Sequence, residues 1–146
     1  MIAEHHLALH EDYPDWIGII NTRLSPAKQI QHIGNYVSEL CEMNYGSSPE
    51  ILFTGDQETT FAYIPVHIEY MMMEVLKNAM RATVEYSQKI RRKDHPPVEV
   101  TIGRGENDIG IRVRDQGGGI PYSGMACHDK FQFQKFLGGI KRKVPK

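Results

Sequence analysis

Two long stretches of the chain repeat apolar residues at helical spacing. In the first, Ser25-Pro26 has the form of an N-cap followed by proline at the first helical position, and Gly46 is a typical helix end. Apolar residues recur between these signals, three or four positions apart, at Ile30, Ile33, Val37, Leu40 and Cys41. The second stretch begins at Pro65 and runs to about Lys89. The pattern predicts two helices.

Short runs typical of strands lie between and after these helices. Residues 51–54 and 60–64 are β-type runs, and the Gly55-Asp56 turn between them predicts a hairpin. Residues 98–102 and 109–113 alternate apolar and polar side chains across a polar turn, so we expect a second, antiparallel hairpin. This order of elements predicts an α/β two-layer sandwich, with helices on one face of a mixed sheet.

Length and composition are those of one ordinary globular domain. The chain has 146 residues, of which 40% are hydrophobic, and its formal net charge is −1. This charge gives no support for nucleic-acid binding, and no apolar run is long enough for membrane insertion. Two cysteines, Cys41 and Cys127, are too few for a disulfide framework.

The second predicted helix is apolar almost all round except for one polar stripe. At about 100° per residue the stripe consists of Tyr70, Glu74, Lys77, Asn78, Arg81 and Glu85. Glu74 and Asn78 are four residues apart, so their side chains share a face and offer oxygen ligands suited to Mg²⁺. The alternative is a solvated stripe with pairs such as Glu74 with Lys77, and for the stripe alone we favour it.

A second polar feature follows the last predicted strand. Asp115 stands at the strand end and precedes the glycines at positions 117–119, which would let the backbone approach a ligand closely. Its carboxylate could accept a hydrogen bond from an exocyclic amine such as that of adenine. A glycine-rich turn capped by aspartate explains the same residues equally well.

Together the two features carry a specific family resemblance. The stretch E-V-L-K-N-A-M-R-A-T-V-E at 74–85, with D-Q-G-G-G at 115–119, resembles the N-box and first glycine box of the mitochondrial protein kinases. These are the pyruvate dehydrogenase kinases and the branched-chain 2-oxoacid dehydrogenase kinase. Residues 5–12, 17–20 and 22–26, and Tyr70, are most similar to the branched-chain enzyme. The family shares the Bergerat ATP-binding fold of the GHKL ATPases, and the resemblance covers residues 4 to about 121.

The resemblance implies a site for ATP and Mg²⁺. Glu74 corresponds to the general base that accepts the proton of the substrate serine, and Asn78 to the Mg²⁺ ligand. The positions that correspond to nucleotide-binding residues are Lys77, Asn78, Arg81, Asp115, Gly117 and Gly119. Among them, Asp115 would bind adenine, Gly117 and Gly119 would shape the pocket floor, and the two basic residues would border the site.

The resemblance also implies a division of the chain and a setting for it. Residues 1–24 would be a remnant of the helical regulatory domain and linker, residues 25–121 a partial ATPase domain, and residues 122–146 a basic tail foreign to the family. The family's ATP lid, second glycine-rich motif and mitochondrial import sequence find no match. The implied activity is serine phosphorylation of the E1 component of a 2-oxoacid dehydrogenase complex in the mitochondrial matrix, with docking on E2 and homodimer formation.

Three functional interpretations stay open from the sequence. The first is a fragment of such a kinase, and the second is a non-catalytic product that binds the dehydrogenase complex or the intact kinase. The third is a histidine kinase, which the K-N-A-M-R-A stretch disfavours. The tail carries six basic residues against one aspartate, and its apolar residues predict a short helix: Phe131, Phe133, Phe136, Leu137 and Ile140. We favour a frameshift or a similar origin for it.

Overall fold

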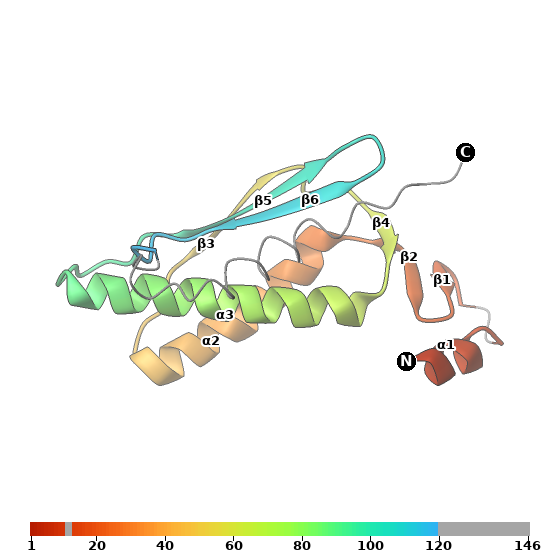
Figure 1. Ribbon diagram of the computed structural model, residues 1–146, viewed down its shortest axis with the longest axis horizontal. Coiled ribbons are helices and arrows are strands. Elements are labelled where there is room, and N and C mark those ends of the chain that lie inside the picture. Colours follow the sequence, from red (N-terminus) through yellow and green to blue (C-terminus); the bar gives the residue numbers. More distant parts are fainter. Residues whose placement is uncertain (11–12, 120–146) are drawn as a thin grey trace, which may run out of the picture.

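A computed structural model describes residues 1–10 and 13–119 of the chain (Figure 1). Two long helices run side by side beneath a layer of strands, and a short helix lies at one end of the molecule. The elements in chain order are α1 (Ile2–Ala8), β1 (Trp16–Ile17), β2 (Ile20–Leu24), α2 (Pro26–Tyr45), β3 (Ile51–Gly55), β4 (Phe61–Tyr63), α3 (Pro65–Lys89), β5 (Val98–Arg104) and β6 (Ile109–Arg114). The predicted tail at 122–146 lies outside the described residues.

Both long helices begin and end where the sequence predicts. The Ser25 hydroxyl accepts a hydrogen bond from the Lys28 backbone N–H at 3.5 Å, which caps α2. Gly46 ends α2 in the left-handed conformation, with φ of +78°. Helix α3 has Pro65 at its first position, where the missing N–H costs nothing.

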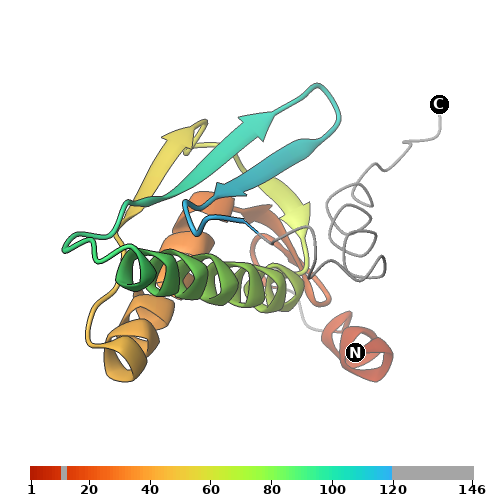
Figure 2. The same cartoon turned by 60° about the vertical axis from the view of Figure 1, so that its left-hand side comes forward.

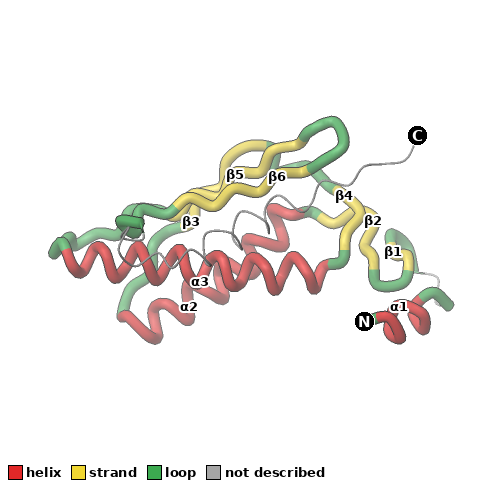
Figure 3. Tube along the Cα trace, in the orientation of Figure 1, coloured by secondary structure: helices red, strands yellow, loops and turns green. Residues whose placement is uncertain are grey.

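Within the described residues the strands form two separate three-stranded sheets, with the orders β1-β2-β4 and β3-β5-β6. The first sheet is antiparallel throughout. In the second, β3 runs parallel to β5, with Ile51 opposite Val98, and β5 pairs antiparallel with β6 as the alternation predicts. The strand layer and its helices confirm the two-layer α/β sandwich, although the described sheet is in two pieces (Figure 3).

The predicted hairpin between residues 51–54 and 60–64 is wrong. Strand β3 pairs instead with β5, and β4 pairs with β2 in the other sheet. The physical reason lies in β5, where Val98, Val100 and Ile102 are fully buried and give β3 an apolar neighbour. The Gly55-Asp56 turn, with φ of +84° at Gly55, therefore leads the chain out of one sheet and towards the other.

The hydrophobic core lies between the helices and the second sheet. Fully buried side chains come from both long helices and from β5, among them Ile30, Val37, Leu76, Met80, Val84, Val98, Val100 and Ile102. Strand β2 lies within residues 1–24 and yet pairs with β4, whereas α1 buries none of its side chains. None of the helices in residues 1–10 and 13–119 is both long and apolar enough to cross a membrane.

Candidate functional site

The polar stripe lies on the surface of α3, as its pattern indicates. Glu74, Asn78, Arg81 and Glu85 are exposed, whereas Leu76 and Met80 on the opposite side of the helix have no exposed surface. The core thus fixes the rotation of the helix, and this rotation presents the stripe outward.

Ion pairs along the helix occupy four of the stripe's charged groups. The Lys77 ammonium lies 2.6 Å from a Glu74 carboxylate oxygen, and the Arg81 Nε donates to a Glu85 carboxylate oxygen at 2.8 Å. The hydrogen bond and charge of Glu85 raise the pKa of Arg81 above its usual value. The solvated pairing that we favoured for the stripe alone is therefore present. The Asn78 amide, between the two pairs, makes no side-chain hydrogen bond to the described residues.

The glycine segment folds as a tight turn against α3. One oxygen of the Asp115 carboxylate accepts the Gly117 N–H at 2.8 Å, so this carboxylate caps its own turn. A β-carbon at Gly117 would lie 2.5 Å from that of Ala82, and one at Gly118 would lie 2.5 Å from the Tyr86 ring. Only glycine allows this approach.

These contacts bring the two predicted features to the same part of the helix. Ala82 follows Arg81 directly and lies one turn beyond Asn78. In Figure 2 the chain after β6 bends down to lie beside α3. Gly119 has φ of +71°, and a β-carbon there would meet nothing within 4 Å. The glycine turn therefore lies beside the part of α3 that carries the stripe.

A groove of about 250 Å³ lies beside the stripe, between α2 and α3. It is lined by Val37, Leu40, Cys41, Asn44, Tyr45, Glu74, Lys77, Asn78, Met80 and Arg81. Asp115 and Gly117 are outside it. In this groove burial raises the pKa of the Cys41 thiol, and the nearby Glu42 carboxylate adds to the effect. The thiol donates to the Ser47 carbonyl oxygen at 3.5 Å.

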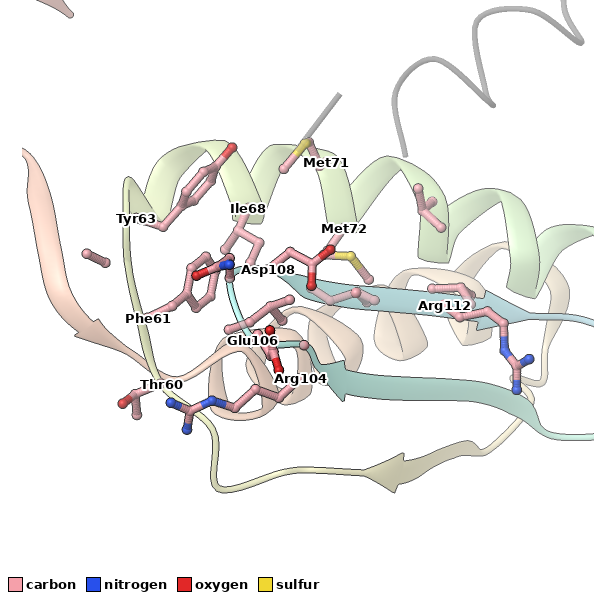
Figure 4. Close-up of a pocket in the computed structure, with 18 residues that line it drawn as sticks. Thr60, Phe61, Tyr63, Ile68, Met71, Met72, Arg104, Glu106, Asp108 and Arg112 are labelled. Carbon is pink, nitrogen blue, oxygen red and sulfur yellow. The ribbon is translucent and has the colours of Figure 1, made fainter. Parts of the chain in front are cut away.

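A larger groove, of about 520 Å³, is a feature that sequence reasoning missed (Figure 4). It is bordered by β4, the first half of α3, the β5–β6 loop and β6. The sequence assigns its apolar residues, such as Met71, Phe61 and Ile111, to strands and to the core. The only feature of the sequence that could have indicated this groove is that α3 has more apolar residues than a helix buried on one side requires.

The arrangement of oxygen ligands suits Mg²⁺ only together with a phosphate group. Within residues 1–10 and 13–119, no three His, Cys, Asp or Glu side chains gather in a way that could hold a metal ion. Glu74 and Asn78 supply one carboxylate and one amide oxygen on adjacent turns. Mg²⁺ commonly keeps several waters and binds through one or two protein ligands plus substrate phosphates, so a single ligand such as the Asn78 amide oxygen fits that mode.

Comparison with curated proteins finds several mitochondrial kinases. A pyruvate dehydrogenase (acetyl-transferring) kinase of Arabidopsis thaliana is 36% identical over 127 residues, which cover 86% of this chain and 34% of the plant protein. The kinase of Schizosaccharomyces pombe is 32% identical over 82% of the chain, and human isozyme 4 is 33% identical over 83%. The aligned parts cover 29% and 31% of those two proteins. No family model matches the chain.

Fold and comparison together define the class of this protein. The described residues form a partial α/β sandwich of the GHKL ATPase type, with the stripe on α3 and the glycine turn packed against the same helix. The chain is homologous to the mitochondrial pyruvate dehydrogenase kinases over more than four fifths of its length, which confirms the family resemblance of its motifs. It spans about a third of the length of these relatives.

Proposed function

We propose that this chain carries the first half of the nucleotide site of a mitochondrial protein-serine kinase, and that it binds adenine nucleotide with Mg²⁺. The observation that carries the proposal is the contact of the glycine turn with α3 one helical turn beyond Asn78. This contact supports the proposal, because an adenine acceptor at Asp115 and a phosphate-side ligand at Asn78 would then share one surface.

Four side chains of the stripe, together with Asp115, have a role in this proposal. Asn78 would offer its amide oxygen to Mg²⁺, and the metal would supply positive charge that neutralises the phosphates. Asp115 has one carboxylate oxygen bound to the Gly117 N–H, and the other accepts the exocyclic amine of adenine. Lys77 and Arg81 add positive charge near the phosphates. Phosphoryl transfer depends mainly on such positioning and charge neutralisation.

Glu74 is the proposed general base for the hydroxyl of the substrate serine. Its ion pair with Lys77 holds one carboxylate oxygen in place and leaves the other to accept a proton. General-base catalysis of this kind contributes about 10²–10⁴-fold to a rate. The larger part of the acceleration would come from the bound nucleotide and metal.

The relatives' names suggest the setting. We place the protein in the mitochondrial matrix, where its substrate is the E1 component of a 2-oxoacid dehydrogenase complex. Docking on E2 and homodimer formation complete the proposal from the family. The preference for the branched-chain complex, based on Tyr70 and on residues 5–12, 17–20 and 22–26, stays a prediction, as does the division of the chain at residues 24 and 121.

Calorimetric titration of the full chain with Mg·ADP tests the nucleotide site. We expect saturable binding that is lost in Asn78→Ala and in Asp115→Ala and retained in Gln88→Ala, an exposed polar position near the end of α3. Binding that is equal in all four proteins would contradict the site. A chain that binds then justifies an assay of E1 phosphorylation, in which Glu74→Gln is expected to lower the rate without weakening binding.

A non-catalytic, partner-binding product is the second candidate function. It is favoured by the open surface of the site and by the carboxylate of Asp115 that caps its own turn. A chain that is folded by circular dichroism and binds no Mg·ADP would support this candidate and exclude the kinase half-site.

A further inference from the structure

The larger groove lies between the last strands of the two sheets. Strand β4 is the last strand of one sheet and β6 is the last strand of the other, and α3 borders the groove beside both. Among residues 1–10 and 13–119, no strand pairs with the outer edge of β6. Such an edge presents a row of backbone N–H and C=O groups to which an extended segment of another protein can bond.

The hydrogen bonds of the β5–β6 hairpin show which groups of β6 this edge presents. The Gly105 N–H donates to the Asp108 carbonyl oxygen at 2.8 Å, and along an antiparallel ladder bonded and non-bonded pairs then alternate. The even-numbered residues of β6 therefore bond to β5. The odd-numbered residues, Ile109, Ile111 and Val113, turn their N–H and C=O groups to the outer edge. Within the described residues these three N–H groups have no acceptor.

The same three residues of β6 present apolar side chains to the groove. Ile109, Ile111 and Val113 are half-buried against the core, and they line the groove together with Met71 and Val75 of α3. The volume of about 520 Å³ lies within the range of ligand sites, about 300–1,000 Å³. Neighbouring residues of adjacent strands share a face, so a strand added to β6 would place every second side chain over α3. These side chains should be apolar.

The opposite face of β6 is basic. Arg112 and Arg114 are exposed, and in Figure 4 the Arg112 guanidinium points away from Met71 and Met72. The Arg114 guanidinium lies 3.5 Å from a Glu99 carboxylate oxygen, whereas Arg112 forms no ion pair with any residue that the structure describes. A carboxylate opposite Arg112 on an added strand would stabilise the pairing, and a lysine or arginine there would destabilise it.

We propose that the groove and the outer edge of β6 bind an extended segment of a partner protein in which apolar and acidic residues alternate. The segment adds to β6 as a further strand, with its apolar side chains over α3 and its carboxylates beside Arg112. Because the chemistry repeats every two residues, this complementarity holds for either direction of the added strand. The site is distinct from the stripe and the glycine turn, and it goes beyond the proposed nucleotide binding.

Fluorescence anisotropy of labelled peptides with the full chain tests the partner's chemistry. We expect saturable binding of the peptide T-V-E-I-E-V-T, whose sequence reads the same in both directions. The matched peptide T-V-K-I-K-V-T keeps every apolar residue and should bind about fivefold more weakly. Serine in place of the central isoleucine should weaken binding about tenfold, because the groove loses a buried aliphatic side chain. No saturable binding, or equal binding of the three peptides, would overturn the proposal.

A charge change in the chain tests the place of binding. Arg112→Glu should weaken binding of the acidic peptide about fivefold and strengthen binding of the basic peptide. The matched control Arg92→Glu makes the same charge change at an exposed position beyond the end of α3 and outside the groove, so it should leave both affinities unchanged. Equal responses of the two variants would indicate an effect of net charge alone and would overturn the proposal.

Amide hydrogen exchange, followed by NMR in the unaltered chain, tests the added strand. The acidic peptide should slow exchange about tenfold at Ile109, Ile111 and Val113 and change little at Gly110 and Arg112, which already bond to β5. Protection without this alternation would overturn strand addition. Protection of all three amides without peptide would show that a second copy or another part of the chain covers the edge, and it would overturn the proposal too. These measurements need no nucleotide, so failure of the proposed kinase site would leave their outcome unaffected.

Discussion

Gly117 packs so closely against Ala82 of α3 that no side chain fits between them. A β-carbon on Gly117 would stand 2.5 Å from the Ala82 β-carbon and 2.8 Å from its carbonyl carbon. This contact joins the glycine segment to α3, and through α3 to the stripe that contains Asn78.

Gly117→Ala should therefore destabilise the fold and weaken nucleotide binding together. Overpacking of this kind costs about 1–3 kcal/mol in the free energy of unfolding. The matched control is Gly110→Ala in β6, where a β-carbon meets nothing within 4 Å. Urea denaturation and Mg·ADP titration of both variants check the prediction. Equal losses at the two positions would contradict the role of the Ala82 contact.

Substitutions at Gly55 and Gly46 separate two costs of a side chain, a steric clash with a neighbouring strand and backbone strain alone. Gly55 and Gly46 both have positive φ, +84° and +78°, but a β-carbon at Gly55 would lie 2.1 Å from the Ile102 carbonyl oxygen, whereas one at Gly46 meets nothing. Gly46→Ala should cost about 1 kcal/mol, the usual penalty for a non-glycine residue in this conformation. Gly55→Ala should cost clearly more, because it also separates β3 from β5. The urea midpoints of unfolding of the two variants measure these losses of stability. Similar midpoints would contradict the expectation that Gly55→Ala also separates β3 from β5.

The Glu74–Lys77 pair should contribute little to stability. Both side chains are more than two-fifths exposed, and such pairs stabilise proteins by about 0–1 kcal/mol. Lys77→Met is therefore expected to change the free energy of unfolding by less than about 0.5 kcal/mol at 0.15 M salt, with circular dichroism as the readout. Weaker Mg·ADP binding in the same variant would indicate that Lys77 acts on the phosphates. A loss of stability above 1 kcal/mol would show that the pair is structural.

Cys41 should make stability depend on pH at alkaline values. Burial, with Glu42 as a smaller cause, raises the pKa of its thiol in the folded chain. The unfolded chain then loses the proton first as the pH rises, so stability is full below the unfolded pKa of about 8.5 and declines above it. In Cys41→Ala, compared in a Cys127→Ser background, this part of the decline should disappear. Urea midpoints of unfolding between pH 7 and 10 measure this decline in stability. Parallel curves with and without Cys41→Ala would argue against a raised pKa of the Cys41 thiol.

The sequence predicts those parts of the fold that depend on neighbouring residues. Ser25, Gly46 and Pro65 mark the helix limits through local backbone chemistry, and the alternation at 98–113 is enough to define the last hairpin. The pairing of β3 with β5 cannot be predicted in this way. Paired residues such as Ile51 and Val98 lie 47 residues apart, and the turn at Gly55 suits a local hairpin equally well.

The candidate site shows the same division. Helical periodicity is sufficient to place Glu74, Asn78 and Arg81 on one face, and the structure has them there. Contact of Gly117 with Ala82 could not be read from spacing, since it depends on how β6 lies over α3. To predict the larger groove, one must know how the two sheets lie relative to each other. The sheets share no strand, so no local sequence pattern contains that information.

The parallel pairing of β3 and β5 also has a consequence for the order of events during synthesis. Ile51 leaves the ribosome 47 residues before its partner Val98, and the whole of α3 is made in between. Helix α2 is made before α3 and is its main packing partner, so only the side of α3 that faces the second sheet stays uncovered until β5 and β6 appear. Closing so long a loop is slow, and this interval is where a chaperone would have most to do.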